Sequence, residues 1–132
     1  MHHSRLCSIL IDCRAELIEP ATHFWSRALG REVKEVGPRY TSLATPEGEL
    51  TVDLQRVSGP SGVHLDIETD DLEAEVRRLE ALGARRKRKV RRWWVMEAPS
   101  GHTFCVVKAF SPEFAARAKP WSEAVTEGNC AE

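Results

Sequence analysis

The chain has 132 residues, of which 42% are hydrophobic and 30% are charged, and its formal net charge is −1. This length fits one domain of ordinary size, and the apolar fraction supplies a core, which excludes a disordered chain. The near-neutral charge argues against a chain built throughout to bind nucleic acid or an anionic membrane. No apolar run approaches the roughly 18 residues of a membrane-spanning helix, so no membrane partner is expected.

The cysteines and the N-terminus bear on the cellular location. Cys7, Cys13, Cys105 and Cys130 form no Cys-x-x-Cys pair. The N-terminus leads directly into a strand pattern and has no small-residue cleavage site, which argues against a secretory signal. Reduced thiols are the simplest interpretation, and the sequence therefore predicts a cytoplasmic location.

The first half of the chain begins with a strand pattern at 6–11. Residues 19–30 then place apolar side chains at helical spacing, with Pro20 in the first turn and Gly30 as the C-terminal stop. Further strands are predicted at 39–43 and 50–57, and the second of these alternates strictly between apolar and polar residues.

The same pattern starts again after a loop at 58–62 that contains Gly and Pro. Residues 63–68 alternate as a strand, and an apolar stripe at helical spacing covers 72–82. Asp70 and Glu73 have the spacing of a capping box, so Asp70 is the predicted N-cap. Strands are then predicted at 85–91, 93–96 and 104–107, and a short helical stretch at 114–118.

Both halves therefore follow the order of strand, helix and further strands. The helix stops at Gly30 and Gly83 lie 53 residues apart, and such a period in so short a chain indicates a duplication rather than a solenoid. We predict an α+β fold with one domain over 1–110, made of two modules at about 4–57 and 62–108, and a partly helical C-terminal tail over 111–132.

Several stretches resemble a known family. Residues 9–12 and 24–30 are similar to the first strand and helix of glyoxalase-like domains, 63–67 to the strand that opens their second module, and 94–107 to their penultimate hairpin. The chain thus resembles the glyoxalase/bleomycin-resistance (vicinal oxygen chelate) superfamily over about 4–108. The resemblance implies two βαβββ modules that form a U-shaped mixed sheet around a small-molecule cleft, and a homodimer.

Metal-dependent members of this superfamily bind a divalent ion through His and Glu side chains. Carried over by motif, the ligand positions fall on Arg5, His64 and Cys105, with Asp53 or Gln55 on the fourth strand. Because Arg has no lone pair to give a metal, neither a standard metal site nor any cofactor is favoured. A divalent metal held by His64, Cys105 and Asp53 stays open as an alternative, in which the thiolate would suit zinc.

The residues expected on the cleft-facing side of the strands make an amphipathic pocket for an organic ligand. Arg5 has the geometry to hold a carboxylate or phosphate, and His64 with Asp66 or Glu68 has the chemistry of a general acid and base. The alternative is that Arg5 and the acidic residues pair with one another and are structural. The predicted ligand-binding residues are Arg5, Cys7, Asp53, Gln55, His64, Trp93, Val95 and Cys105, with Ile9 and Ile11 on the same side; the candidate catalytic residues are His64 and Asp66.

Residues 85–92 carry seven cations in eight residues and are followed by Trp93 and Trp94. A basic stretch beside aromatic residues can bind single-stranded nucleic acid. A basic edge strand also prevents unwanted pairing with other sheets, and this interpretation is favoured over nucleic-acid binding.

The sequence therefore predicts a small-molecule-binding protein of this superfamily without a standard metal site. The alternative is a lyase or isomerase of the same fold that uses His64 with a carboxylate or a divalent metal. A second alternative is the binding of nucleic acid or an acidic partner through residues 85–92. Whether the chain is an enzyme is left open by the sequence.

Overall fold

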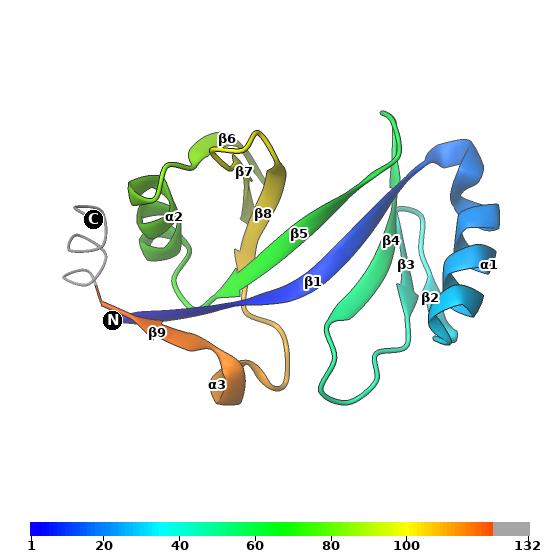
Figure 1. Ribbon diagram of the computed structural model, residues 1–132, viewed down its shortest axis with the longest axis horizontal. Helices are drawn as coiled ribbons and strands as arrows, with labels where there is room; N and C mark the ends of the chain where they lie inside the picture. The colour runs from blue at the N-terminus through cyan, green and yellow to red at the C-terminus, as the bar shows by residue number, and fades with distance from the viewer. Residues whose placement is uncertain (123–132) are drawn as a thin grey trace. The chain divides into compact units, whose positions relative to one another are not determined.

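The computed structural model describes residues 1–122 (Figure 1). These residues form the predicted α+β fold, with a mixed sheet whose strands follow the order β2-β3-β4-β1-β5-β8-β7-β6, while β9 pairs with β1. No helix within this range is long and apolar enough to cross a membrane. The part of the predicted tail beyond residue 122 lies outside the described residues.

The chain forms two compact units, and their boundary runs through strands β1 and β5. Unit 2 is residues 8–64, and unit 1 comprises residues 1–7 and, within the described chain, 65–122. The first seven residues thus join the second half of the chain, whereas the modules predicted from the sequence were each continuous.

Unit 2 has one helix on one face of its strands. Its elements are the C-terminal part of β1 (His2–Arg14), the 3-10 helix η1 (Ala15–Leu17), α1 (Ile18–Leu29), β2 (Val33–Val36), β3 (Tyr40–Leu43) and β4 (Thr51–Val57). β1 runs parallel to β4, and β3 is antiparallel to both β2 and β4. α1 ends where predicted, because Gly30 adopts the left-handed conformation that favours glycine (φ 66°).

The core of unit 2 corrects the predicted orientation of β1. Ile11 belongs to the buried cluster beneath α1, and Ile9 packs against the same cluster, so neither faces away from the helix as the sequence analysis expected. Residues 9–11 are all apolar, and such a run hides the alternation that tells one face of a strand from the other. The remaining cluster members are Cys13, Ile18, Leu43, Val52 and Leu54, with Ala21 and Trp25 packed against them.

Unit 1 contains the other helices. Its elements are the N-terminal part of β1, β5 (Gly62–Thr69) from Leu65 on, α2 (Leu72–Ala81), β6 (Arg85–Val90), β7 (Trp93–Glu97), β8 (Thr103–Lys108), α3 (Phe114–Arg117) and β9 (Lys119–Trp121). β5 is parallel to β8, and β7 is antiparallel to both β8 and β6. α2 covers a core of Val76, Leu79, Met96 and Val106.

The predicted cap of α2 is wrong by one residue. The N-cap is Asp71, whose side chain accepts a hydrogen bond from the backbone of Ala74 (3.1 Å). Asp70 instead accepts from the backbone and the ring of His3 (2.7 and 2.8 Å). Glu73 is held by Arg86 (2.7 Å) rather than turned back to the helix start. Long-range partners therefore override the local capping pattern.

Two fully buried carboxylates lie in unit 1. Glu68 accepts hydrogen bonds from Arg5 (3.0 Å) and from two backbone amides in the segment after β8. Glu75 accepts a bidentate pair from Arg78 (2.9 and 2.8 Å) and contacts His2 Nε2 (2.7 Å). Both charges are thus neutralised where they are buried, as a low-dielectric interior requires.

Candidate functional site

The side of the unit 2 strands opposite α1 is polar. In β4, Val52 and Leu54 are buried in the core, so Thr51, Asp53 and Gln55 point to the other side. In the parallel pairing of β1 with β4, Asp12 lies opposite Gln55, so the two side chains share a face. We call this surface the polar face; it is made of Asp12, Ser42, Thr51, Asp53, Gln55 and His64.

A histidine–aspartate pair lies on the polar face. His64 Nδ1 is 2.7 Å from Asp12 Oδ2, and their side chains are 15% and 19% exposed. An Nδ1–H that donates to the carboxylate orients the imidazole ring and leaves Nε2 as the proton acceptor. The second carboxylate oxygen of Asp12, Oδ1, is buried and has no hydrogen-bond partner among the described residues.

Asp12 was missed as a functional residue by the sequence analysis. The strand pattern predicted that His64 works with Asp66 or Glu68, because alternate residues share a face of a strand. The structure gives His64 a partner 52 residues away in sequence. The sequence signal that could have identified Asp12 is its position as an acidic residue at the end of the apolar run of β1.

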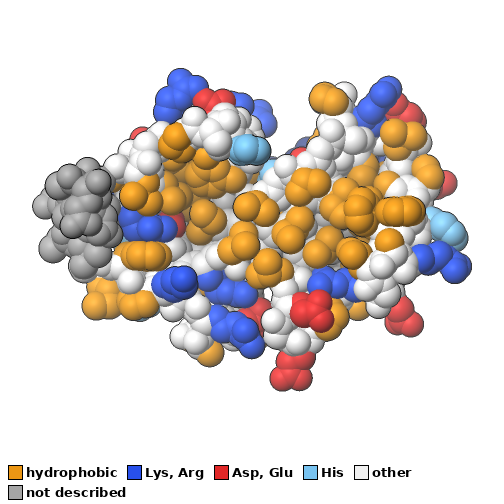
Figure 2. Space-filling model, viewed as in Figure 1, with side chains coloured by type: hydrophobic (Ala, Val, Ile, Leu, Met, Phe, Trp, Pro, Cys, Tyr) orange, Lys and Arg blue, Asp and Glu red, His pale blue; other side chains and the backbone are white. Residues whose placement is uncertain are grey.

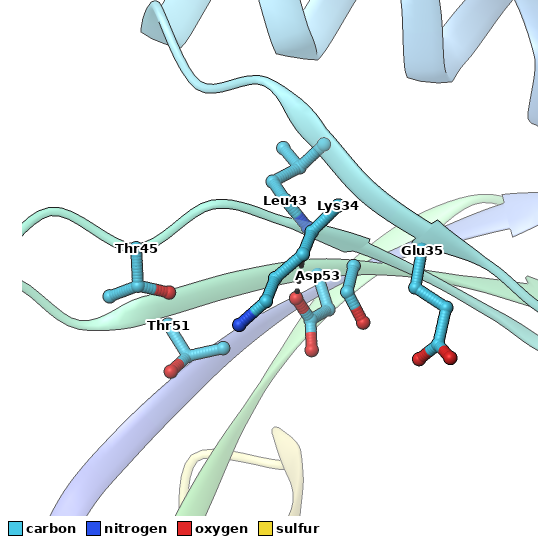
Figure 3. A pocket seen from close by; sticks show the side chains of 7 residues that line it. Lys34, Glu35, Leu43, Thr45, Thr51 and Asp53 are labelled. Atoms are coloured by element: carbon cyan, nitrogen blue, oxygen red, sulfur yellow. Dashed lines mark hydrogen bonds between the residues drawn. The ribbon is translucent and has the colours of Figure 1, made fainter.

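A pocket of about 390 Å³ opens in the same unit, over β2, β3 and β4 (Figure 3). The side chains of Lys34 and Asp53 both point into it. Asp53 Oδ1 also accepts a hydrogen bond from the backbone of Leu43 (3.4 Å), which holds this carboxylate at the edge of β3. The lining consists of Lys34, Glu35, Ser42, Leu43, Thr45, Thr51 and Asp53.

The pocket can therefore offer one ammonium group, several hydroxyls and two carboxylates to a ligand. Lys34 and Glu35 were not predicted, because the residues of β2 are all exposed and carry no alternating pattern. Gln55, a predicted ligand-binding residue, lies outside the lining and donates from Nε2 to the Tyr40 hydroxyl (3.4 Å).

A second group of side chains continues along β5. Asp66 follows His64 by two residues on this strand, and Cys105 lies opposite Asp66 on β8. The candidate ligand atoms of Asp66 and Cys105 in unit 1 lie within 4.8 Å of one another. Asp53, the third member of the predicted ligand set, lines the Lys34 pocket instead.

The donor set of this group suits zinc. One imidazole nitrogen, one carboxylate oxygen and one thiolate sulfur are all zinc ligands, and three protein ligands leave a position open. A carboxylate behind the histidine, as Asp12 is behind His64, is the usual arrangement around a metal-bound imidazole. The residues present therefore fit a divalent metal of this kind.

The remaining predicted residues lie in unit 1. Arg5 is 11% exposed and contacts the carboxylates of Glu68 (3.0 Å) and Glu113 (3.4 Å). Cys7 is 1% exposed, and its thiol donates to the backbone oxygen of Asp66 (3.4 Å). Val95 lies opposite Cys105 in the β7–β8 pairing, and Trp93, two residues before Val95, lies on the same face of β7.

Cys13 is a buried thiol of unit 2 that takes no part in the site. Burial raises the pKa of this thiol, and the neighbouring charge of Asp12 raises it further. The thiol therefore stays protonated at neutral pH, and its side chain packs in the core beneath α1.

Comparisons with known proteins bear on the fold. A family model described as a glyoxalase-like domain matches residues 8–107. A hypothetical protein from Bacillus halodurans is similar in structure, with 12% sequence identity, a TM-score of 0.60, and coverage of 82% of this chain and 96% of that one. Among curated proteins, none matches the sequence significantly.

Two enzymes with solved structures also share this fold. Homoprotocatechuate 2,3-dioxygenase from Arthrobacter globiformis has 17% identity and a TM-score of 0.59, over 81% of this chain and 36% of that chain. The enzyme from Brevibacterium fuscum, in complex with 3,4-dihydroxyphenylacetate, has 15% identity and a TM-score of 0.61, over 83% and 37%. The chain spans little more than a third of either enzyme, and at these identities the likeness shows the fold alone.

Proposed function

Because the chain belongs to the glyoxalase-like domain family, we propose that it binds a small organic molecule on the polar face of unit 2. The observation that carries the proposal is that the strand face with the Asp12–His64 pair also carries Asp53, which lines a pocket together with Lys34. A cleft with a few convergent polar groups on rigid strands is the usual form of a small-molecule site.

The lining indicates the chemistry of the ligand. The ammonium of Lys34 would bind a carboxylate or phosphate, and the carboxylate of Asp53 would accept hydrogen bonds from hydroxyl groups. The ligand class that fits is therefore an anion of modest size that also carries hydroxyl groups. Of the predicted ligand-binding residues, Asp53 and His64 belong to this proposal.

Proton transfer is a second candidate function, and the Asp12–His64 hydrogen bond favours it. His64 Nε2 would take a proton from a carbon beside a substrate carbonyl and return it to a neighbouring atom, as in a lyase or isomerase. Asp12 would hold the ring and stabilise the imidazolium that forms in between. The chemistry needs no cofactor.

The alternative role of His64 is to bind a divalent metal. His64, Asp66 and Cys105 would hold the ion, and Asp12 would orient His64 from behind. A metal bound there would supply a Lewis acid next to the ligand. The metal-free site favoured by the sequence stays a prediction.

The cellular location and the oligomeric state also stay predictions. Cys7, Cys13 and Cys105 are free thiols, which supports the proposed cytoplasmic location. Light scattering on purified protein would test the homodimer that the family resemblance implies.

The binding proposal is tested by NMR titration with 3,4-dihydroxyphenylacetate and a panel of smaller hydroxycarboxylates. Saturable shifts should appear at residues of β2, β3 and β4. Lys34→Met should weaken binding about tenfold, since a charge-assisted contact is lost. The matched control is Arg39→Met, which removes an exposed cation of the same unit outside the pocket and should leave the affinity unchanged.

His64→Ala separates the candidates further. Its melting temperature should stay near that of the original chain, while binding or turnover falls. Shifts confined to unit 1, or an absence of saturation with every acid tested, would contradict the binding proposal. One equivalent of zinc by plasma mass spectrometry, lost in Cys105→Ala, would establish the metal alternative; no uptake from zinc-containing buffer would dismiss it.

A further inference from the structure

Strand β6 lies at the end of the sheet order, next to β7 alone. Its outer side therefore presents backbone N–H and C=O groups that pair with no strand among residues 1–122. Arg91 and Arg92 follow directly and make the turn to β7, with Arg91 in a left-handed conformation (φ 52°). This edge is the surface from which a partner has access to the unit 1 sheet.

The cations of this edge divide into two groups. Arg85 is paired with Glu97, and Arg86 is held between Glu73 (2.7 Å) and Glu80 (3.0 Å). The other cations make no ion pair with a carboxylate of the described chain, and all of them are exposed. We call this second group the basic edge; it consists of Lys87, Arg88, Lys89, Arg91 and Arg92. Figure 2 shows Lys and Arg side chains gathered over the β6–β7 hairpin, at the upper left.

Aromatic side chains near the basic edge do not suit nucleic acid. Trp94 packs against the core of unit 1, and its ring is covered by Arg86 (5.0 Å) and Lys89 (5.2 Å). Trp93 is half-buried. Single-stranded nucleic acid is bound by stacking bases on open aromatic rings, whereas the ring of Trp94 is already contacted by two cations.

We propose that the basic edge binds an acidic segment of another protein, which adds to β6 as an extended strand. The open backbone groups of β6 would supply the hydrogen bonds of strand addition. The basic edge would supply charge complementarity, and five unneutralised cations within six residues repel one another until acidic groups approach. A few charges suffice to protect an edge from pairing, so protection alone does not account for so many.

The test is fluorescence anisotropy with a labelled peptide of alternating Glu and Val. Arg88→Glu/Lys89→Glu should weaken binding at least about tenfold, because four units of charge change at exposed positions. The matched control, Arg27→Glu/Arg39→Glu, makes the same change of net charge at exposed positions of unit 2 and should bind as the original chain does. Circular dichroism should show the same fold in both double variants.

A second peptide tests the strand addition itself. It has the same charge and length but carries proline at alternate positions, which removes backbone donors. It should bind several-fold more weakly than the first peptide. Equal binding of both peptides, or equal loss in both double variants, would overturn the proposal in favour of unspecific charge attraction. Tighter binding of an oligothymidylate of equal charge would assign the surface to nucleic acid, and no binding at low salt would leave it as edge protection.

Discussion

The carboxylates of Glu68 and Glu75 in unit 1 have no exposed surface, whereas the Asp12–His64 pair in unit 2 keeps 19% and 15% of its side chains exposed. The buried carboxylates of unit 1 are each bound by an arginine and by further donors. In unit 2, Asp12 has one oxygen without a partner among the described residues, and Lys34 and Asp53 point into an open pocket. The two buried carboxylates of unit 1 are thus fully occupied by contacts within the fold, whereas the charged residues of unit 2 are the ones for which we propose ligand binding.

The largest effect is expected for Glu75→Ala. It leaves the partly buried Arg78 and the buried His2 without their shared carboxylate. Removing one partner of a buried pair costs about 3–5 kcal/mol in the free energy of unfolding. Urea denaturation measures it, and Glu80→Ala, an exposed glutamate of the same helix, should cost less than about 1 kcal/mol. Equal losses in the two variants would show that burial does not set the difference.

Arg5→Met should cost less, about 1.5–3 kcal/mol, because the contact with buried Glu68 and the longer one with the partly exposed Glu113 are lost while two backbone amides still bind Glu68. The same denaturation experiment measures it. If Arg5 binds ligand instead, as the sequence analysis predicted, the variant should keep its stability and lose affinity. The two outcomes decide whether Arg5 stabilises the fold or binds the ligand.

The stability of unit 1 should decrease gradually as the pH falls. Burial acts to raise the pKa of Glu75, but hydrogen bonds from Arg78, His2 and Ser4 outweigh it, so the pKa lies below its ordinary value. The contribution of Glu75 to the free energy of unfolding is therefore fully present above about pH 4.3, the ordinary pKa of a glutamate. It is lost as the pH falls through the lowered pKa of the folded state. The protection of α2 and β9 amides from hydrogen exchange, relative to the intrinsic exchange rate at each pH, should decrease below that pH. In Glu75→Gln, this part of the decrease should be missing.

The smallest effect on stability is expected for Asp12→Asn, below about 1 kcal/mol, since an amide can still contact the His64 ring. Ligand affinity or turnover should nevertheless fall if the pair works as proposed. A cost as large as that of Glu75→Ala would place Asp12 with the structural carboxylates. Thermal and urea unfolding of Asp12→Asn and Glu75→Ala, measured under the same conditions, test this prediction.

Sequence patterns predicted the elements whose periodicity was complete. The alternation of β4 and the glycine that ends α1 gave the correct element and, for β4, the correct face. The apolar run of β1 predicted a strand but not which of Ile9 and Leu10 faces the helix. β2 and β9 are short and mostly exposed, so they carry no burial pattern to recognise. The family resemblance, which rests on order and spacing, is confirmed by the match over residues 8–107.

The candidate site was predictable only in part, because its contacts are made by pairing between distant strands. His64 and Asp53 were identified from residue type and strand face. Asp12 and Lys34 were missed, since no local spacing relates them to those two residues. Arg5 was assigned to the ligand because a fixed cation suits an anion, with pairing to acidic residues as the alternative, and the structure gives it contacts with Glu68 and with Glu113, which the sequence did not indicate.

The pairing of β9 with the start of β1 has a consequence for the order in which the chain acquires structure. Residues 8–64 form unit 2 from one continuous stretch, so its contacts can form as soon as His64 has been synthesised. The pairing of the first strand of unit 1 with β9 must wait much longer, because Trp121 donates to Ser4 across 117 residues of chain. Closing so long a loop comes late in folding. The opening residues can therefore contact Glu68, Asp70 and Glu75 first, and their pairing with β9 is added only after Trp121 has been synthesised.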